Sequence, residues 1–211
     1  MKIKKLLCAA LALTLLLALG ACGNKSGEGS SPTDVKPGSS PTDVDVPATP
    51  TPEPQSVSTL TLCGIPVVMN GQPTGVGYKG VTYADGVLTI GEGVTMESNS
   101  AQYPCIDFSG ELEIVVEGDC TLSSTGGAPA ISGGREGDSD ASDLTISGSG
   151  KLTAAAADAA GIAVTGKLSV SDGALDITGA PAAQYGELLL GGLSKVTDET
   201  DTHFAIDRTK E

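Results

Sequence analysis

Short runs in which apolar and polar residues alternate recur along the chain, and glycine separates one run from the next. Four runs begin with a leucine that is followed two positions later by a second apolar residue, and a fragment of the pattern comes after them. These leucines are Leu88, Leu112, Leu144 and Leu168, with the fragment at Leu188. Their spacings are 24, 32, 24 and 20 residues. A repeat of about 20–30 residues is typical of a solenoid, in which each turn buries its apolar row against its neighbours.

Each unit holds three short alternating stretches, which predict three strands. In the unit at Leu112 they are residues 112–116, 120–122 and 129–132. Because successive side chains of a strand point to opposite faces, one set should point inward and the other outward. The inward set is Leu112, Ile114, Val116, Leu122 and Ile131, and the outward set is Glu113, Val115 and Glu117. Three strands in each turn, parallel from turn to turn, predict an all-β fold: a short single-stranded parallel β-helix of about five turns.

The repeat also predicts the limits of the folded domain. Residues 57–193 should form the repeat domain, with residues 57–83 as an N-terminal cap, because an open end would expose the apolar column. The cap contains Asn70-Gly71, a dipeptide that favours a tight turn. The alanine-rich residues 154–160 are too few for a persistent helix, so a loop with at most a brief helical turn is expected. Residues 194–211 are predicted to be a loosely held tail.

The N-terminal residues have the pattern of an export signal. Residues 1–21 hold three lysines and then an apolar stretch that is too short for an ordinary spanning helix. The stretch ends in Leu19-Gly-Ala-Cys22, which resembles the lipobox of bacterial lipoproteins and implies cleavage before Cys22 and a lipid on that cysteine. The alternative is a secretory signal with an incidental cysteine. The expected location is the extracellular face of the bacterial cytoplasmic membrane, with the lipid as the only membrane contact.

Residues 22–56 predict a disordered linker between this anchor and the domain. The sequence Ser-Ser-Pro-Thr-Asp-Val occurs twice in this segment, and a proline-rich run follows. Proline removes backbone donors, and the segment has no apolar periodicity from which a core could form. A semi-extended tether of ~30 residues reaches on the order of 100 Å.

Composition favours a narrow core and argues against nucleic acid as a partner. Aromatic residues make up 3% of the chain and tryptophan is absent, which suits a thin column of aliphatic residues. The formal net charge of −14 should repel nucleic acid and anionic lipid and attract divalent cations, although it would also keep an exported surface soluble. The scarcity of aromatic rings argues against neutral glycans held by stacking. The whole supply is Tyr78, Tyr83, Tyr103, Tyr185, Phe108 and Phe204.

The order of the apolar runs resembles a known family. The runs are those that begin at Leu60, Val81, Leu112 and Leu144, and the resemblance covers roughly residues 57–192. It is to surface proteins of anaerobic Gram-positive bacteria described as carbohydrate-binding domain-containing proteins. These look like relatives of a clostridial family of right-handed, pectate-lyase-like β-helices without lyase motifs, which bind acidic plant polysaccharide with calcium. The resemblance implies a right-handed β-helix, polysaccharide as the partner and calcium as a cofactor.

Two groups of acidic residues are candidate sites. The 32-residue spacing includes an insertion, residues 133–143, and such insertions often lie on the binding face of a solenoid. Its Glu136, Asp138, Asp140 and Asp143 could supply several of the six to eight oxygens that calcium takes. The alternative is a solvated loop. The second group, Glu111, Glu113, Glu117 and Asp119, could hold calcium that bridges to a uronic acid, or could serve only to prevent aggregation.

Catalysis has little support in the sequence. Arg135 is the only arginine of the predicted domain before the tail, and His203 has no catalytic motif around it. No catalytic residue is therefore expected. Cys63, Cys105 and Cys120 remain after the signal, and either a Cys105–Cys120 bridge or buried free thiols are consistent with them. The sequence predicts non-catalytic polysaccharide binding, with a surface spacer and a degenerate polysaccharide lyase as alternatives.

Overall fold

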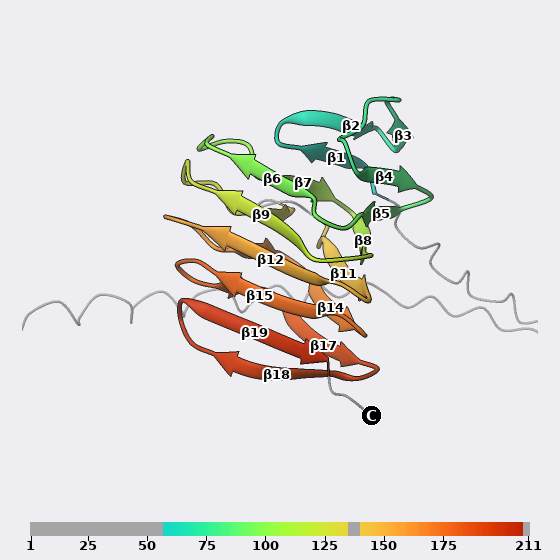
Figure 1. The fold of residues 1–211 in the computed structure, drawn as a ribbon. Helices are drawn as coiled ribbons and strands as arrows, with labels where there is room; N and C mark the ends of the chain where they lie inside the picture. Colours follow the sequence, from blue (N-terminus) through green and yellow to red (C-terminus); the bar gives the residue numbers. More distant parts are fainter. Residues whose placement is uncertain (1–56, 135–139, 209–211) are drawn as a thin grey trace, which may run out of the picture. The chain divides into compact units, whose positions relative to one another are not determined.

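The computed structural model of the protein describes residues 57–134 and 140–208, and these residues form an all-β fold. Within those two ranges there are 19 strands and no helix, so none that could span a membrane. The predicted signal peptide, Cys22 and the linker lie outside the described residues, as do Glu136 and Asp138. The strands form three sheets, which we name A, B and C (Figure 1).

The bounds of the strands follow, sheet by sheet in the order in which neighbours pair. Sheet A contains β17 (Glu187–Gly191), β14 (Lys167–Ser171), β11 (Asp143–Gly148), β8 (Glu111–Val116), β5 (Val87–Ile90) and β4 (Val81–Ala84). Sheet B contains β16 (Ala183–Gln184), β13 (Ile162–Val164), β10 (Ile131–Gly133), β7 (Ile106–Ser109), β1 (Thr59–Leu62), β2 (Ile65–Met69) and β3 (Gln72–Pro73). Sheet C contains β18 (Ser194–Glu199), β19 (His203–Arg208), β15 (Ala174–Thr178), β12 (Lys151–Ala156), β9 (Cys120–Ser124) and β6 (Thr95–Ser98).

From β5 to β17 the chain visits sheets A, C and B in rotation. Each strand from β5 to β14 pairs in parallel with the strand three positions later, as β8 does with β11 and β11 with β14. The stack of strands is visible in Figure 1, with the N-terminal strands at the top and β18 at the bottom. We call each passage through the three sheets a rung.

The repeated leucines lie opposite one another in the later units, and the first unit differs. Leu144 lies opposite Leu112 on one side and Leu168 on the other, and Leu168 lies opposite Leu188. Leu88, however, lies opposite Ile114, two residues further along β8. Because side chains alternate with a period of two, this shift keeps Leu88 pointing inward, and its side chain is fully buried.

Alternation predicts the core correctly. The five residues predicted to point inward are each at most 1% exposed: Leu112, Ile114, Val116, Leu122 and Ile131. The predicted outward residues are half-buried or exposed. Burial of the aliphatic column is the main favourable contribution to the free energy of folding, because the chain has few aromatic side chains that could be buried in its place.

Antiparallel hairpins form the N-terminal end of the stack. β1 pairs antiparallel with both β2 and β7, and β4 pairs antiparallel with β5. The β2–β3 turn is made by Asn70 and Gly71 at φ of 52° and 73°, so the turn expected from this dipeptide is confirmed. The predicted cap thus consists of hairpins, whose pairing differs from that of the parallel rungs.

The C-terminal residues require a correction. Instead of a loosely held tail, residues 194–208 contain β18 and β19, which form an antiparallel hairpin on β15. Phe204 and Ile206 on β19 are 2% and 0% exposed and lie opposite Ile177 and Leu175. Their alternation gives β19 one apolar face, and this face covers the end of the aliphatic column.

The first half of the alanine-rich segment differs from the expected loop, whereas residues 157–160 lie in a loop as predicted. Residues 151–156 form β12, in which Ala154 is fully buried between Leu122 on β9 and Ile177 on β15. The helix propensity of alanine is worth only tenths of a kcal/mol per residue, so parallel pairing on both sides outweighs it.

Candidate functional site

Two loops and sheet B surround a polar groove of about 520 Å³. Its walls are residues 101–104, between β6 and β7, and residues 127–129, between β9 and β10. Asp107 on β7 and Ser132 on β10 complete the lining. These two residues are directly opposite each other in the parallel register and are half-buried on the outer face of sheet B. The groove therefore places a carboxylate and a hydroxyl between two loops.

Tyr103 is the exposed aromatic side chain of this groove. It is 51% exposed, although its ring rests against the β1–β2 turn. A Cβ added at Gly64 in that turn would lie 3.1–3.4 Å from Cγ, Cδ1 and Cδ2 of Tyr103. Gly64 also has φ of +81°, so both the ring contact and the backbone conformation favour glycine there.

Hydrogen bonds fix the loop that carries Tyr103. The Ser98 hydroxyl donates to the carbonyl oxygen of Tyr103. The hydroxyl oxygen of Ser100 accepts from the backbone N–H groups of Gln102 and Tyr103, at 3.1 and 3.2 Å. Both backbone groups of Tyr103 are thus hydrogen-bonded, and its ring is supported by the β1–β2 turn. A fixed, half-exposed ring beside amide, hydroxyl and carboxylate groups can stack on the apolar face of a sugar and bond its hydroxyls.

Sequence reasoning did not select this groove, although it counted Tyr103 among the aromatic residues. One signal was present: Tyr103 lies between alternating runs, so the alternating pattern does not assign it to the core. The contact with Gly64 joins residues that are far apart in the chain, and no spacing rule indicates it.

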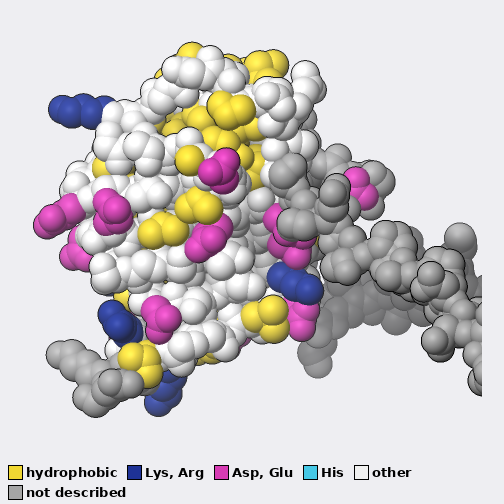
Figure 2. All heavy atoms as spheres, turned by 90° about the vertical axis from the view of Figure 1, so that its right-hand side faces the viewer, with side chains coloured by type: hydrophobic (Ala, Val, Ile, Leu, Met, Phe, Trp, Pro, Cys, Tyr) yellow, Lys and Arg dark blue, Asp and Glu magenta, His cyan; other side chains and the backbone are white. Residues whose placement is uncertain are grey.

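The predicted acidic row on β8 is only partly gathered by the fold. Glu111 and Glu113 lie on the outer face of sheet A, whereas Glu117 and Asp119 lie in the turn between β8 and β9. The Glu113 carboxylate accepts a hydrogen bond from the Ser147 hydroxyl of β11 at 2.9 Å. Figure 2 shows acidic side chains spread over this side of the domain, with hydrophobic side chains gathered toward the N-terminal end.

Several carboxylates join one rung to the next. Asp119 accepts from the backbone N–H of Lys151 at 3.2 Å, and Asp143 accepts from that of Lys167 at 2.8 Å. Asp172 does the same for Leu193 at 3.2 Å. In each case a carboxylate of one rung accepts a hydrogen bond from a backbone N–H of the following rung. That N–H lies at the start of a strand or in a turn. Asp119 and Asp143, which were predicted as ligand-binding and metal-binding residues, therefore have a structural function.

The calcium hypothesis gains no support from side-chain positions. Asp140 is exposed, and Asp143 is engaged by Lys167. The end of the insertion is tied into the fold by Ser142, whose N–H donates to Thr165 and whose hydroxyl accepts from Gly110. Among residues 57–134 and 140–208, no group of three or more His, Cys, Asp or Glu side chains is placed to hold a metal ion.

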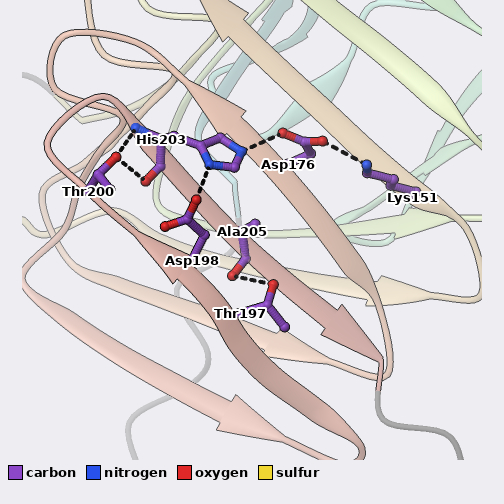
Figure 3. A network of polar contacts seen from close by, with 7 residues as sticks. All are labelled: Lys151, Asp176, Thr197, Asp198, Thr200, His203 and Ala205. Atoms are coloured by element: carbon purple, nitrogen blue, oxygen red, sulfur yellow. Dashed lines mark hydrogen bonds and ion pairs between the residues drawn. The ribbon is translucent and has the colours of Figure 1, made fainter.

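His203 belongs to a charged network on sheet C (Figure 3). Its Nδ1 lies 2.8 Å from a carboxylate oxygen of Asp198, and its Nε2 lies 3.1 Å from one of Asp176. The other oxygen of Asp176 accepts from Lys151 Nζ at 2.7 Å. The hydrogen bond to Asp198, followed by that to Asp176, raises the pKa of His203 above 6.5. The hydrogen bond from Lys151 lowers the pKa of Asp176 below 3.8, and the hydrogen bond from His203 makes a smaller contribution in the same direction.

This network predicts a pH dependence of the C-terminal hairpin. The contribution of His203 to stability is complete below pH 6.5 and is lost as the pH rises through its raised pKa. That of Asp176 is complete above pH 3.8 and is lost as the pH falls through its lowered pKa. Amide protection factors in β18 and β19, which compare each exchange rate with its intrinsic rate at the same pH, should therefore be highest between about pH 4 and 6.5. The chain has one histidine, so His203→Gln should abolish the fall in protection above pH 6.5. If that fall persists in the variant, the network is not its cause.

Comparison with protein-family models, curated proteins and solved structures finds no match for this chain. The resemblance described above therefore stays a prediction.

Proposed function

We propose that this chain is a surface lipoprotein whose repeat domain binds polysaccharide without catalysis. The domain is a short right-handed parallel β-helix, and a lipid on Cys22 holds it on the extracellular face of the bacterial cytoplasmic membrane. Two observations support the helix: the rotation through sheets A, C and B, and the parallel register between rungs. Right-handedness follows from the strong preference of parallel crossover connections for that hand.

The observation that carries the binding function is the groove with Tyr103. A non-catalytic sugar site needs an apolar platform and polar groups that bond hydroxyls, and the groove offers both. Its lining contains no lysine or arginine among the residues that the structure describes. A neutral, hydroxyl-rich glycan fits this lining.

The test is a glycan array probed with the full chain and with two Tyr103 variants. Tyr103→Ala should weaken binding about ten-fold, because loss of one stacked ring costs about 1.4 kcal/mol or more. Tyr103→Phe keeps the ring and is the matched control, so its affinity should stay within about two-fold of the unaltered chain. If Tyr103→Ala binds as well as Tyr103→Phe does, the groove is not the site.

Two alternatives are separated by further arms of the same experiment. The acidic surface favours calcium-assisted binding of an acidic polysaccharide, and a chelator should then remove the signal. The carboxylates that join successive rungs favour a spacer that binds no sugar, and the array should then be blank with and without calcium. Polygalacturonate incubated with the protein should give no absorbance from unsaturated products, because we propose no lyase step.

A further inference from the structure

Cys63 and Cys105 face each other at the N-terminal end of sheet B. The antiparallel register of β1 and β7 ends with Leu62 opposite Ile106, and Cys63 and Cys105 are the residues directly beyond that pair, with Cys63 at φ of 49°. The backbone N–H of Cys63 donates to the carbonyl oxygen of Cys105 at 2.9 Å. Two residues joined by such a backbone hydrogen bond lie close enough for the Cα separation of about 4.4–6.8 Å that a disulfide spans.

The side chains of this pair interact directly. Cys105 is fully buried, and its thiol donates to the carbonyl oxygen of Ser123 at 3.2 Å. Burial raises its pKa to about 12, and the neighbouring Cys63 contributes to the rise. Burial also raises the pKa of Cys63, against a smaller lowering by its hydrogen bond to Cys105. Cys63 is only half-buried, so it is the thiol that a reagent in solution reaches first.

Cys120 does not compete for Cys105. The Cys105 sulfur contacts the backbone of Ser123, which is three residues further along β9 than Cys120. At about 3.3 Å per residue, this places Cys120 roughly 10 Å along the strand, beyond the reach of a disulfide. Cys120 is itself 3% exposed and points into the aliphatic column. The bridge between Cys105 and Cys120 that the sequence left open is therefore not the one that the fold favours.

We propose that Cys63 and Cys105 form a disulfide that fixes the loop of Tyr103 to the β1–β2 turn. Cys63 precedes Gly64, on which the Tyr103 ring rests, and Cys105 is two residues after Tyr103. The bond joins the support of the ring to the segment that carries it. The effect on sugar binding depends on the proposed function, whereas the bond and the fixed loop do not.

The oxidant is a low-molecular-weight disulfide. Cys63 loses its proton to solvent and attacks one sulfur of the oxidant, which forms a mixed disulfide and releases one small thiolate. Cys105 then loses its proton and attacks the Cys63 sulfur, which expels the second small thiolate. Two electrons pass from the protein to the oxidant, which takes up the two protons as two thiols. The high pKa of Cys105 makes the second step the slower one.

Peptide mapping of the unaltered chain tests the bond. The full chain is treated with oxidised glutathione, then denatured, alkylated and digested, and the peptides are identified by mass spectrometry. We expect one cross-linked pair that joins the peptides of Cys63 and Cys105 and is two hydrogen atoms lighter than its separate thiols, with Cys120 alkylated. Cys120→Ala should leave the cross-link unchanged. A cross-link from Cys105 to Cys120, a stable glutathione adduct on Cys63, or alkylation of both Cys63 and Cys105 would overturn the proposal.

Amide exchange measured by NMR tests whether the bond fixes the loop. The N–H groups of Gln102 and Tyr103 should exchange at least ten-fold more slowly in the oxidised chain than in the reduced chain. The N–H of Lys167, bound to Asp143 in a later rung, is the internal reference and should not change. Equal rates at Gln102 and Tyr103 in a chain that carries the bond would overturn the positioning role. If both forms bind no glycan while the bond and the slowed exchange are present, the proposed function fails and this inference stands.

Discussion

Leu144→Ala is expected to lower the free energy of unfolding by about 2–5 kcal/mol, the range observed when a buried leucine leaves a cavity. Leu144 is fully buried in a central rung, with Leu112 opposite on one side and Leu168 on the other. Because each repeat of a solenoid contacts only its neighbours, the cavity weakens two interfaces at once. The rigid strands on both sides leave little freedom for the column to collapse around the gap.

Urea unfolding followed by circular dichroism gives this loss directly. The matched control is Leu189→Ala, since Leu189 on β17 is 42% exposed and loses less buried surface. We expect the control to cost less than about 1 kcal/mol. Equal losses in the two variants would contradict the assignment of Leu144 to the core.

Gly150→Ala is expected to destabilise the domain by about 1–3 kcal/mol, the usual cost of overpacking. Gly150 lies in the turn between β11 and β12, and a Cβ there would overlap the backbone of Gly118 in the preceding rung, only 2.5 Å from its carbonyl carbon. Backbone atoms of a neighbouring rung cannot move aside as a flexible side chain can. The rungs would therefore have to separate locally.

Gly173→Ala is the matched control for this change. Gly173 is the corresponding residue of the next rung, because Ala174 lies opposite Lys151. The nearest atom to a Cβ at Gly173 is 3.8 Å away, an ordinary contact. Its φ is not positive, so alanine fits the backbone there. Alanine should be neutral, or should stabilise the domain by about 0.4–1 kcal/mol because it lowers the conformational entropy of the unfolded chain. Similar melting temperatures for the two variants would show that rung spacing at Gly150 tolerates a side chain.

The sequence was sufficient for the three-strand unit because alternation depends only on which side chains must be buried. It was not sufficient for the register of the first unit. A shift of two residues leaves every side chain on the same face, so Leu88 could be placed opposite Leu112 or Ile114 without any change in the pattern. The sequence does not predict the C-terminal hairpin, because Phe204 and Ile206 are the buried residues of β19 and their neighbours are mostly polar or charged.

The candidate site was less predictable than the core. The sequence predicts the acidic residues as ligands, yet the carboxylates of Asp119 and Asp143 accept hydrogen bonds from backbone N–H groups of the following rung. Such bonds form only between turns that are neighbours in successive rungs, and the register of the sheets determines which turns are neighbours. The groove depends on a contact between Tyr103 and Gly64 that forms only once the N-terminal hairpin has paired with β7. Sequence spacing describes neither arrangement.

The in-register parallel pairing of β8, β11 and β14 has a consequence for how such a domain changes size. Residues 144–167 begin at one leucine of the ladder and end just before the next, so they make up one complete layer. Duplication or deletion of such a segment alters the height of the domain by about 4.8 Å, the spacing of neighbouring strands. The hairpins that close both ends do not take part in that change. A gene that encodes this fold can therefore lengthen or shorten the protein in whole layers while its terminal structures stay the same.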